Sequence, residues 1–260
     1  MADLRDQVRY QTGTQTRAPA EIDQGLRSYM LGIYNYMATA LAVTAIAALG
    51  VANFATTSDP SQAVGQLGNG TMLTALGGLI YTSPLRWVIM LAPLAFILVL
   101  SFGIHKLSKP AMTGLFYAFA TLMGVSMSWI FMVYTSGSIV QTFFVTAAAF
   151  GALSLWGYTT KKDLSAMGTF LMMGLFGLII AMLVNIFVGS SALQFAINVI
   201  GILIFAGLTA WDTQRLKNTY DMVVGNAEMM AKSSIMGALS LYLNFVNMFQ
   251  FLLAFMGNQE

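Results

Sequence analysis

The sequence predicts an all-α polytopic membrane protein, built as a bundle of seven transmembrane helices. Three observations support this prediction. First, 57% of the residues are hydrophobic and only 8% are charged, whereas soluble domains carry about 25% charged residues. Second, seven apolar stretches have the length of a membrane span. Third, lysine and arginine are concentrated in alternate connections between these stretches, as the positive-inside rule requires.

The apolar stretches follow one another after a polar beginning. A helix needs about 20 apolar residues to cross the hydrocarbon core, and each stretch comes close to that length. We expect helices because backbone in lipid must satisfy its own hydrogen bonds, and the stretches lack the alternation of barrel strands. Pro93 is expected to kink the second helix. The predicted spans are 29–54, 85–104, 111–133, 139–158, 165–188, 193–211 and 237–256.

Residues 1–28 differ from the rest of the chain. They contain four arginines and four acidic residues and have no apolar core. A secretory signal needs such a core, so this segment is expected to be a polar cytosolic tail, with room for a short helix before the membrane. The sequence therefore divides into this tail and a seven-helix membrane domain at 29–257.

The basic residues predict how the bundle is oriented. Eleven of the twelve lie in the tail and in the second, fourth and sixth connections, and only Arg86 lies on the other side. This asymmetry places the N-terminus in the cytosol and the C-terminus outside. The long connection 55–84 is then outside, and its segment TMLTALGGLIY is too short to span, which predicts an interfacial helix.

Composition excludes several function classes. The chain has no cysteine and a single histidine, His105, so thiolate and multi-histidine metal sites are excluded. The net charge of +2 without a basic cluster does not predict nucleic-acid binding. An intramembrane aspartyl protease needs two acids within spans, and a Ser–His dyad would need His105 at a helix end. We therefore expect neither an enzyme nor a cofactor.

Amide side chains mark the last predicted helix. Asn244, Asn247 and Gln250 are three residues apart and share one face about 120° wide. Further amides lie in the fifth and sixth helices, at Asn185, Gln194 and Asn198. Because polar groups in lipid need partners, the stripe should face the bundle interior. Amides that join helices and amides that line a watery path are equally compatible with this pattern.

Asp212 borders the sixth helix at the predicted cytosolic mouth, in IFAGLTAWDTQRL. Asn244 lies about two turns inside the seventh helix, so the two side chains can meet. The alternative, which the sequence taken alone favours, is that Asp212 reaches water and pairs with Arg215 or Lys217.

Three segments resemble the Bax inhibitor-1 family, also called TMBIM or YccA-like membrane proteins. They are KKDLSAMGTFL at 161, GLTAWDTQRLKN at 207 and ALSLYLNFVNMFQFLLAFMG at 238. The last is close to the family pattern A-L-x-L-Y-L-D-F-I-N, and the resemblance extends over nearly all of 29–257. It implies a seven-helix fold with the last helix central. It also implies a pH-sensitive calcium leak gated by two aspartates near the cytosolic side, in the inner membrane of a bacterium.

The resemblance carries over to particular residues. The first family aspartate falls on Asp212, and the second falls on Asn244, which is an amide. The family's basic latch is expected near the end of the second helix, where this chain offers His105 or Lys106. Two close carboxylates share a proton near neutral pH, and an Asp–Asn pair does not, so the family's pH sensing is not carried over.

These observations predict a weak cation leak. The gate and ion-path candidates are Asp212, Asn244 and Asn247, and calcium is the expected cargo. A tight calcium site is not expected, because such sites take six to eight oxygens, several from carboxylates. The alternative is a regulator that does not transport ions and binds a membrane AAA protease, as the resemblance implies for bacterial members, or another membrane protein.

Overall fold

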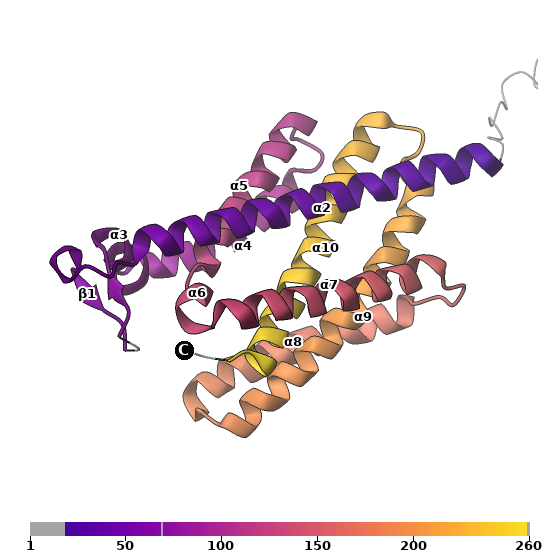
Figure 1. Cartoon of the computed structure of the whole chain (residues 1–260). Coiled ribbons are helices and arrows are strands. Elements are labelled where there is room, and N and C mark those ends of the chain that lie inside the picture. Colours follow the sequence, from indigo (N-terminus) through magenta and orange to yellow (C-terminus); the bar gives the residue numbers. More distant parts are fainter. Residues whose placement is uncertain (1–18, 69, 259–260) are drawn as a thin grey trace, which may run out of the picture.

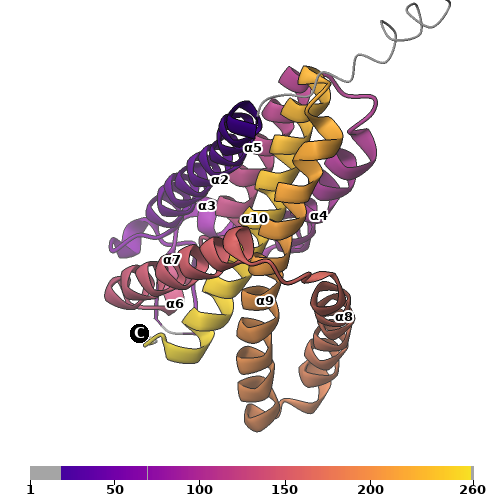
Figure 2. The ribbon, with the colours of Figure 1, turned by 90° about the vertical axis from the view of Figure 1, so that its right-hand side faces the viewer.

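The computed structural model describes residues 19–68 and 70–258. Seven helices in this part of the chain are long and apolar enough to cross a membrane, which confirms the predicted all-α polytopic fold. Figures 1 and 2 show their arrangement. The spans are α2 (Pro19–Ala55), α4 (Leu85–Gly103), α5 (Lys109–Met127) with the short α6 (Ile130–Val133), α7 (Ser136–Thr159), α8 (Ser165–Val188), α9 (Ser191–Val223) and α10 (Ala227–Met256).

Three helices are longer than the apolar stretches that predicted them. Helix α2 begins at Pro19, inside the expected polar tail, while residues 1–18 of that tail lie outside the described residues. Helix α9 continues to Val223, and α10 begins at Ala227. Hydropathy marks where a helix enters lipid, not where its hydrogen bonds end, so polar turns extend these helices. The Asn226 side chain caps α10 by accepting the Met229 N–H at 3.0 Å.

The connection between α2 and α4 contains a small hairpin. The segment expected to form one interfacial helix begins as a strand, continues through a short helix and ends in a π-helical turn. Thr74 ends the strand and caps the short helix, because its hydroxyl accepts the Gly77 N–H at 3.3 Å and donates to the Phe54 carbonyl at 2.8 Å. The elements are η1 (Pro60–Gln62), antiparallel β1 (Gly65–Gln66) and β2 (Met72–Leu73), α3 (Ala75–Gly77) and η2 (Gly78–Thr82).

Helix α4 continues through Pro93. Proline has no N–H, so the carbonyl four residues earlier, at Ile89, loses its partner within the helix. The Ser126 hydroxyl of α5 donates to this carbonyl at 2.7 Å. A neighbouring helix therefore supplies the hydrogen bond that the proline removes, as lipid-embedded backbone requires.

Helix α10 contacts α2, α5, α7 and α9, and the central place of this last helix stays a prediction. Tyr242 of α10 is fully buried, and its hydroxyl lies 2.7 Å from that of Thr44. Two glycines allow close helix contacts. A Cβ at Gly124 would lie 2.4 Å from the Thr44 carbonyl oxygen, and one at Gly157 would lie 2.2 Å from that of Ala210.

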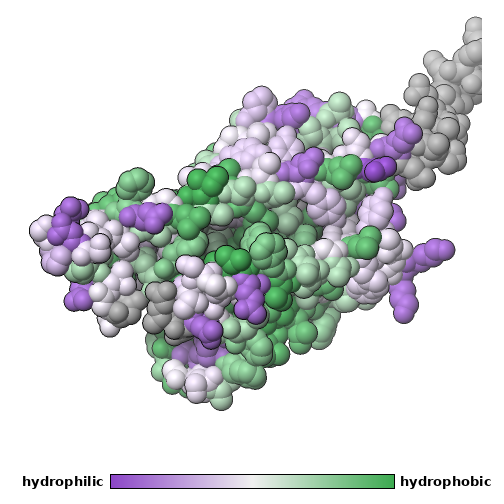
Figure 3. All heavy atoms as spheres, viewed as in Figure 1, coloured by the Kyte–Doolittle hydropathy of each residue, from purple (hydrophilic) through white to green (hydrophobic). Residues whose placement is uncertain are grey.

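Helices α4 and α8 are the least covered spans of the described bundle. Both are long and apolar, and large side chains such as Phe102 of α4 and Phe187 of α8 are at least 80% exposed. Figure 3 shows hydrophobic side chains across the middle of one face of the molecule. Such a surface is stable in contact with acyl chains and would be unstable in water.

Candidate functional site

The site is built around Asp212, a buried carboxylate of α9 that is 4% exposed. Its Oδ2 atom accepts hydrogen bonds from the Asn244 amide at 2.7 Å and the Ser240 hydroxyl at 3.0 Å, both on α10. Its Oδ1 atom lies 2.5 Å from Arg215 Nη2, an ion pair without hydrogen-bond alignment. A buried carboxylate is costly unless it is paired, and here three side chains share that task.

Arg215 is the basic partner of this carboxylate. Its side chain is 47% exposed, and its guanidinium also donates to the Ser240 hydroxyl at 3.1 Å and lies 4.9 Å from the centre of the Trp211 ring. The residues proposed as a basic latch, His105 and Lys106, are exposed after the end of α4 and do not line the cavity that extends from Asp212. Sequence reasoning considered Arg215 only as the alternative partner of Asp212, and the structure shows this pair together with the Asn244 contact.

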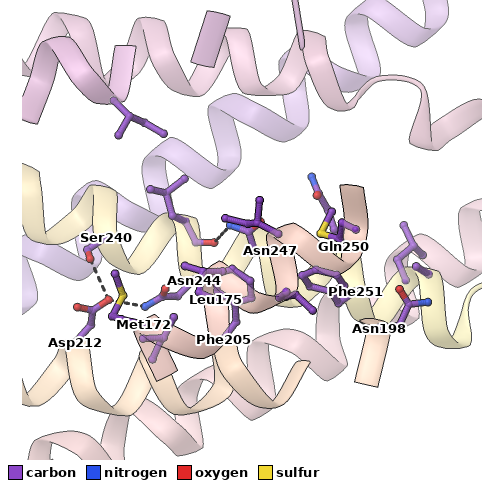
Figure 4. A pocket seen from close by; sticks show the side chains of 18 of the residues that line it. Met172, Leu175, Asn198, Phe205, Asp212, Ser240, Asn244, Asn247, Gln250 and Phe251 are labelled. Carbon is purple, nitrogen blue, oxygen red and sulfur yellow. Dashed lines mark hydrogen bonds between the residues drawn. The ribbon is translucent and has the colours of Figure 1, made fainter. Parts of the chain in front are cut away.

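A cavity of about 650 Å³ extends from this carboxylate between α9 and α10 (Figure 4). Asn247 and Gln250 line it beyond Asn244, so the amide stripe of α10 faces this space. Asn247 donates to the carbonyl of Leu243 in its own helix at 2.8 Å. The opposite walls are apolar and include Leu94 of α4 and side chains of α8.

The other end of the cavity holds a second amide cluster. Asn185 donates to Gln194 at 3.0 Å, and Gln194 donates to Asn198 at 2.9 Å. Gln194 and Asn198 both line the cavity. Residues 194 to 215 of α9 are 21 steps of about 1.5 Å, or about 32 Å, which matches the hydrocarbon thickness of about 30 Å. The polar groups therefore follow the cavity across a full bilayer depth.

Sequence reasoning missed Ser240. It lies four residues before Asn244 and therefore extends the amide stripe by one helical turn toward Asp212. The spacing was visible in the sequence, but serine is common in membrane helices, where it usually bonds to its own backbone. Its partner on α9 distinguishes this serine from the others.

The arrangement suits transient contact with a cation better than stable binding. Within the described residues, no three acidic, histidine or cysteine side chains gather where they could hold a metal ion. The cavity offers one carboxylate, already paired, together with amide oxygens, whereas stable calcium sites use several carboxylates. An ion in this space would therefore be bound weakly and released readily.

Comparison with known proteins agrees with this architecture. The family model for inhibitor of apoptosis-promoting Bax1 matches residues 26–260. The chain belongs to the Bax inhibitor-1 family. A protein of Caulobacter vibrioides is 48% identical over 246 residues, which are 94% of each chain. The inner membrane protein YbhL of Escherichia coli K12 is 42% identical over 238 residues, covering 91% of this chain and 94% of that one.

Proposed function

We propose that this Bax inhibitor-1 family member is an inner-membrane protein that provides a weak leak for cations such as calcium, with Asp212 at its gate. The observation that carries the proposal is the row of polar side chains that follows the cavity over a bilayer depth. The name of the similar protein YbhL supports the inner-membrane location. Amides can also join membrane helices, as Asn244 does here, but Asn247 bonds within its own helix and still lines the cavity, as a hydrated ion path requires.

The ion pair acts as the gate in this proposal. A cation that reaches Asp212 competes with the Arg215 guanidinium for the same carboxylate. Because Arg215 is half-exposed, it can swing toward water without crossing the apolar core. The freed carboxylate would then attract the cation, and the amide oxygens of Asn244 and Asn247 would replace part of its hydration shell.

The test is ion flux in vesicles that contain the purified protein and a calcium-sensitive dye. We expect Asp212→Asn to lower calcium flux about tenfold, the effect of losing about 1.4 kcal/mol of attraction at the gate. Arg215→Gln should raise the flux several-fold, because the competing cation is gone. The matched control is Asp221→Asn, which removes an exposed carboxylate of the same helix that lies outside the cavity lining.

One outcome would overturn the leak: calcium, potassium and proton flux in protein vesicles equal to that in empty vesicles. That result would favour the alternative function, a regulator that binds a membrane AAA protease, which pull-down from native membranes would then examine. An equal effect of Asp212→Asn and Asp221→Asn would instead reject Asp212 as the gate.

We also propose that the N-terminus is cytosolic and the C-terminus outside. Lys161 and Lys162, between α7 and α8, line a small pocket with Lys217 of α9, which groups basic residues of two connections at one end of the bundle. Reporter fusions at residue 260 and in the α2–α4 connection should be active only outside, and a fusion beside Lys161 only in the cytosol. A cytosolic signal at residue 260 would reject this orientation.

A further inference from the structure

A groove lies between α2 and α7, away from the site described above. At its basic end is a cavity of about 750 Å³, lined by residues 27–34 of α2 and 150–158 of α7. A second cavity of about 420 Å³ lies farther along the same two helices, with Phe245 and Phe249 of α10 at its back. In Figure 1, α2 runs across the view above α7, and α10 passes between the two helices.

The groove opens toward lipid. Leu31 and Leu155 line the first cavity and are nevertheless 50% and 64% exposed, and Phe144 lines the second and is 66% exposed. Because all of these residues lie within membrane-spanning segments, their exposed surface faces acyl chains rather than water. The space between α2 and α7 is therefore accessible from the bilayer.

The mouth of the first cavity is positively charged. Arg27 lines it, is exposed, and has no acidic partner among the residues whose side chains are described. Lys217 reaches the same end of α7, donating to the Tyr158 carbonyl at 3.0 Å and lying 5.1 Å from the centre of the Tyr158 ring. Lys161 and Lys162, just beyond the end of α7, line a separate small pocket with Lys217 and Asp163. Arg27 is thus the cation at the opening of the groove, and three lysines lie near the same end of α7.

The floor of the cavity carries one cluster of hydroxyl groups, which are hydrogen-bonded to one another. The Tyr34 and Ser154 hydroxyls lie 2.5 Å apart, and Ser154 lies 3.0 Å from Thr213 of α9. Met30 and Leu31 lie between Arg27 and Tyr34 along α2, and Phe150 lies one turn from Ser154 along α7, so the walls on both sides of these hydroxyls are apolar. The cavity therefore offers a cation at one end and mostly apolar walls along its length, which matches the charged headgroup and the acyl chain of a phospholipid.

We propose that this groove binds one anionic phospholipid, with its phosphate at Arg27 and Tyr158 and one acyl chain between α2 and α7. Basic pockets between helices at a membrane surface are suited to such headgroups. Residues 27 to 34 of α2, which line the first cavity, are seven steps, about 10 Å, and this length lies within one leaflet of a hydrocarbon core of about 30 Å. A free phosphate would occupy the mouth and leave the apolar walls unfilled.

The experiment measures lipids retained by the full-length protein. Protein purified in detergent is incubated with equal amounts of phosphatidylglycerol and phosphatidylcholine, and bound lipids are counted by native mass spectrometry. We expect one retained phosphatidylglycerol, preferred about tenfold. Arg27→Gln should abolish the preference. Its matched control, Arg86→Gln, removes the arginine at the opposite end of the bundle and should keep it.

A second pair of variants tests the acyl-chain part of the groove. A Cβ at Gly151 would meet no atom within 4 Å, so Gly151→Leu should fold and fill the cavity, lowering retention of both lipids at least fivefold. Gly177→Leu on α8 is equally unhindered, lies outside this cavity, and should bind normally. Monodisperse elution and an unchanged melting temperature would show that each variant is folded.

Three results would overturn the proposal. The first is equal retention of the two lipids by the natural protein. The second is an equal loss of preference in Arg27→Gln and Arg86→Gln, which would indicate general surface charge. The third is complete displacement of the bound lipid by millimolar inorganic phosphate, which would identify a free-anion site.

Discussion

Replacing Asn244 with aspartate would convert the amide–carboxylate contact at the gate into a pair of carboxylates. The Asn244 amide nitrogen lies 2.7 Å from Asp212 Oδ2, and both side chains are buried. In the natural protein the amide donates to the carboxylate and does not titrate. In the variant the two groups can remain in contact only if they share a proton.

The size of the effect follows from this separation. Two unit charges about 4 Å apart repel by about 4 kcal/mol at an effective dielectric constant of about 20. That energy corresponds to about three powers of ten in proton affinity, since about 1.4 kcal/mol is a factor of ten. The pair should therefore hold its shared proton to a higher pH than a single carboxyl group does, with Arg215 offsetting part of the repulsion.

The assay is vesicle calcium flux between pH 6 and 8. We expect calcium flux through the natural protein to vary less than about twofold over this range, because carboxyl groups outside the spans do not change their charge there. The pKa of the Asp163 carboxyl is lowered, mainly by the Ser165 hydroxyl and next by the Ser165 N–H. The pKa of Asp59 is lowered by hydrogen bonds from Ser61. Both groups therefore stay ionised throughout this window. Asn244→Asp should gain a five- to tenfold change, with flux rising as the pair becomes charged.

The double variant separates pairing from added charge. Asp212→Asn together with Asn244→Asp leaves one carboxylate with an amide partner, so the pH response should disappear. A response that persists in the double variant would refute the reasoning about the pair. A steep response in the natural protein that survives Asp212→Asn would place the sensor elsewhere, and the single histidine would be the next group to replace.

Three further predictions concern stability and the lining of the path. Asn247→Leu should lower flux several-fold while changing the free energy of unfolding by less than about 1 kcal/mol, because its one hydrogen bond is local. Ser126→Ala should cost about 1–2 kcal/mol in thermal unfolding, and less in a Pro93→Ala background, where the helix supplies its own donor; equal costs would contradict this explanation. Gly157→Ala should destabilise the protein by about 1–3 kcal/mol through its clash with α9, whereas Gly151→Ala, which meets open space, should be neutral or slightly stabilising.

The membrane spans could be predicted because hydropathy and length are local properties of the chain. The predicted stretches lie within helices of the structure, except that the second extends one residue beyond α4 and the third is interrupted by a turn at 128–129 between α5 and α6. The ends were less predictable, since polar turns at Arg215 and Lys232 continue helices beyond the apolar core. The segment at 71–81 was also mistaken for a single helix, because its strand pairs with residues 65–66, a contact that hydropathy does not encode.

The candidate site was partly visible in the sequence. The spacing of Asn244, Asn247 and Gln250 places them on one face of a helix, which follows from the helical period alone. Their orientation toward Asp212 across a cavity depends on how α9 and α10 are rotated against each other. The identity of the basic partner also depended on this packing, because Arg215 lies one turn from Asp212 and beside Ser240, while His105 and Lys106 lie after α4.

The sequence by itself determined that this chain crosses a membrane seven times and that one face of its last helix is polar. Both conclusions rest on the transfer of side chains between water and lipid, which each residue undergoes independently of its distant neighbours. Only the tertiary structure decided which helices meet, which polar groups share a cavity, and where a lipid-facing groove remains between α2 and α7. In lipid both sides of an apolar helix are equally soluble, so hydropathy does not select its neighbours. The neighbours of each helix are instead determined by close packing, as at Gly157, and by hydrogen bonds between helices, as from Ser126 to α4.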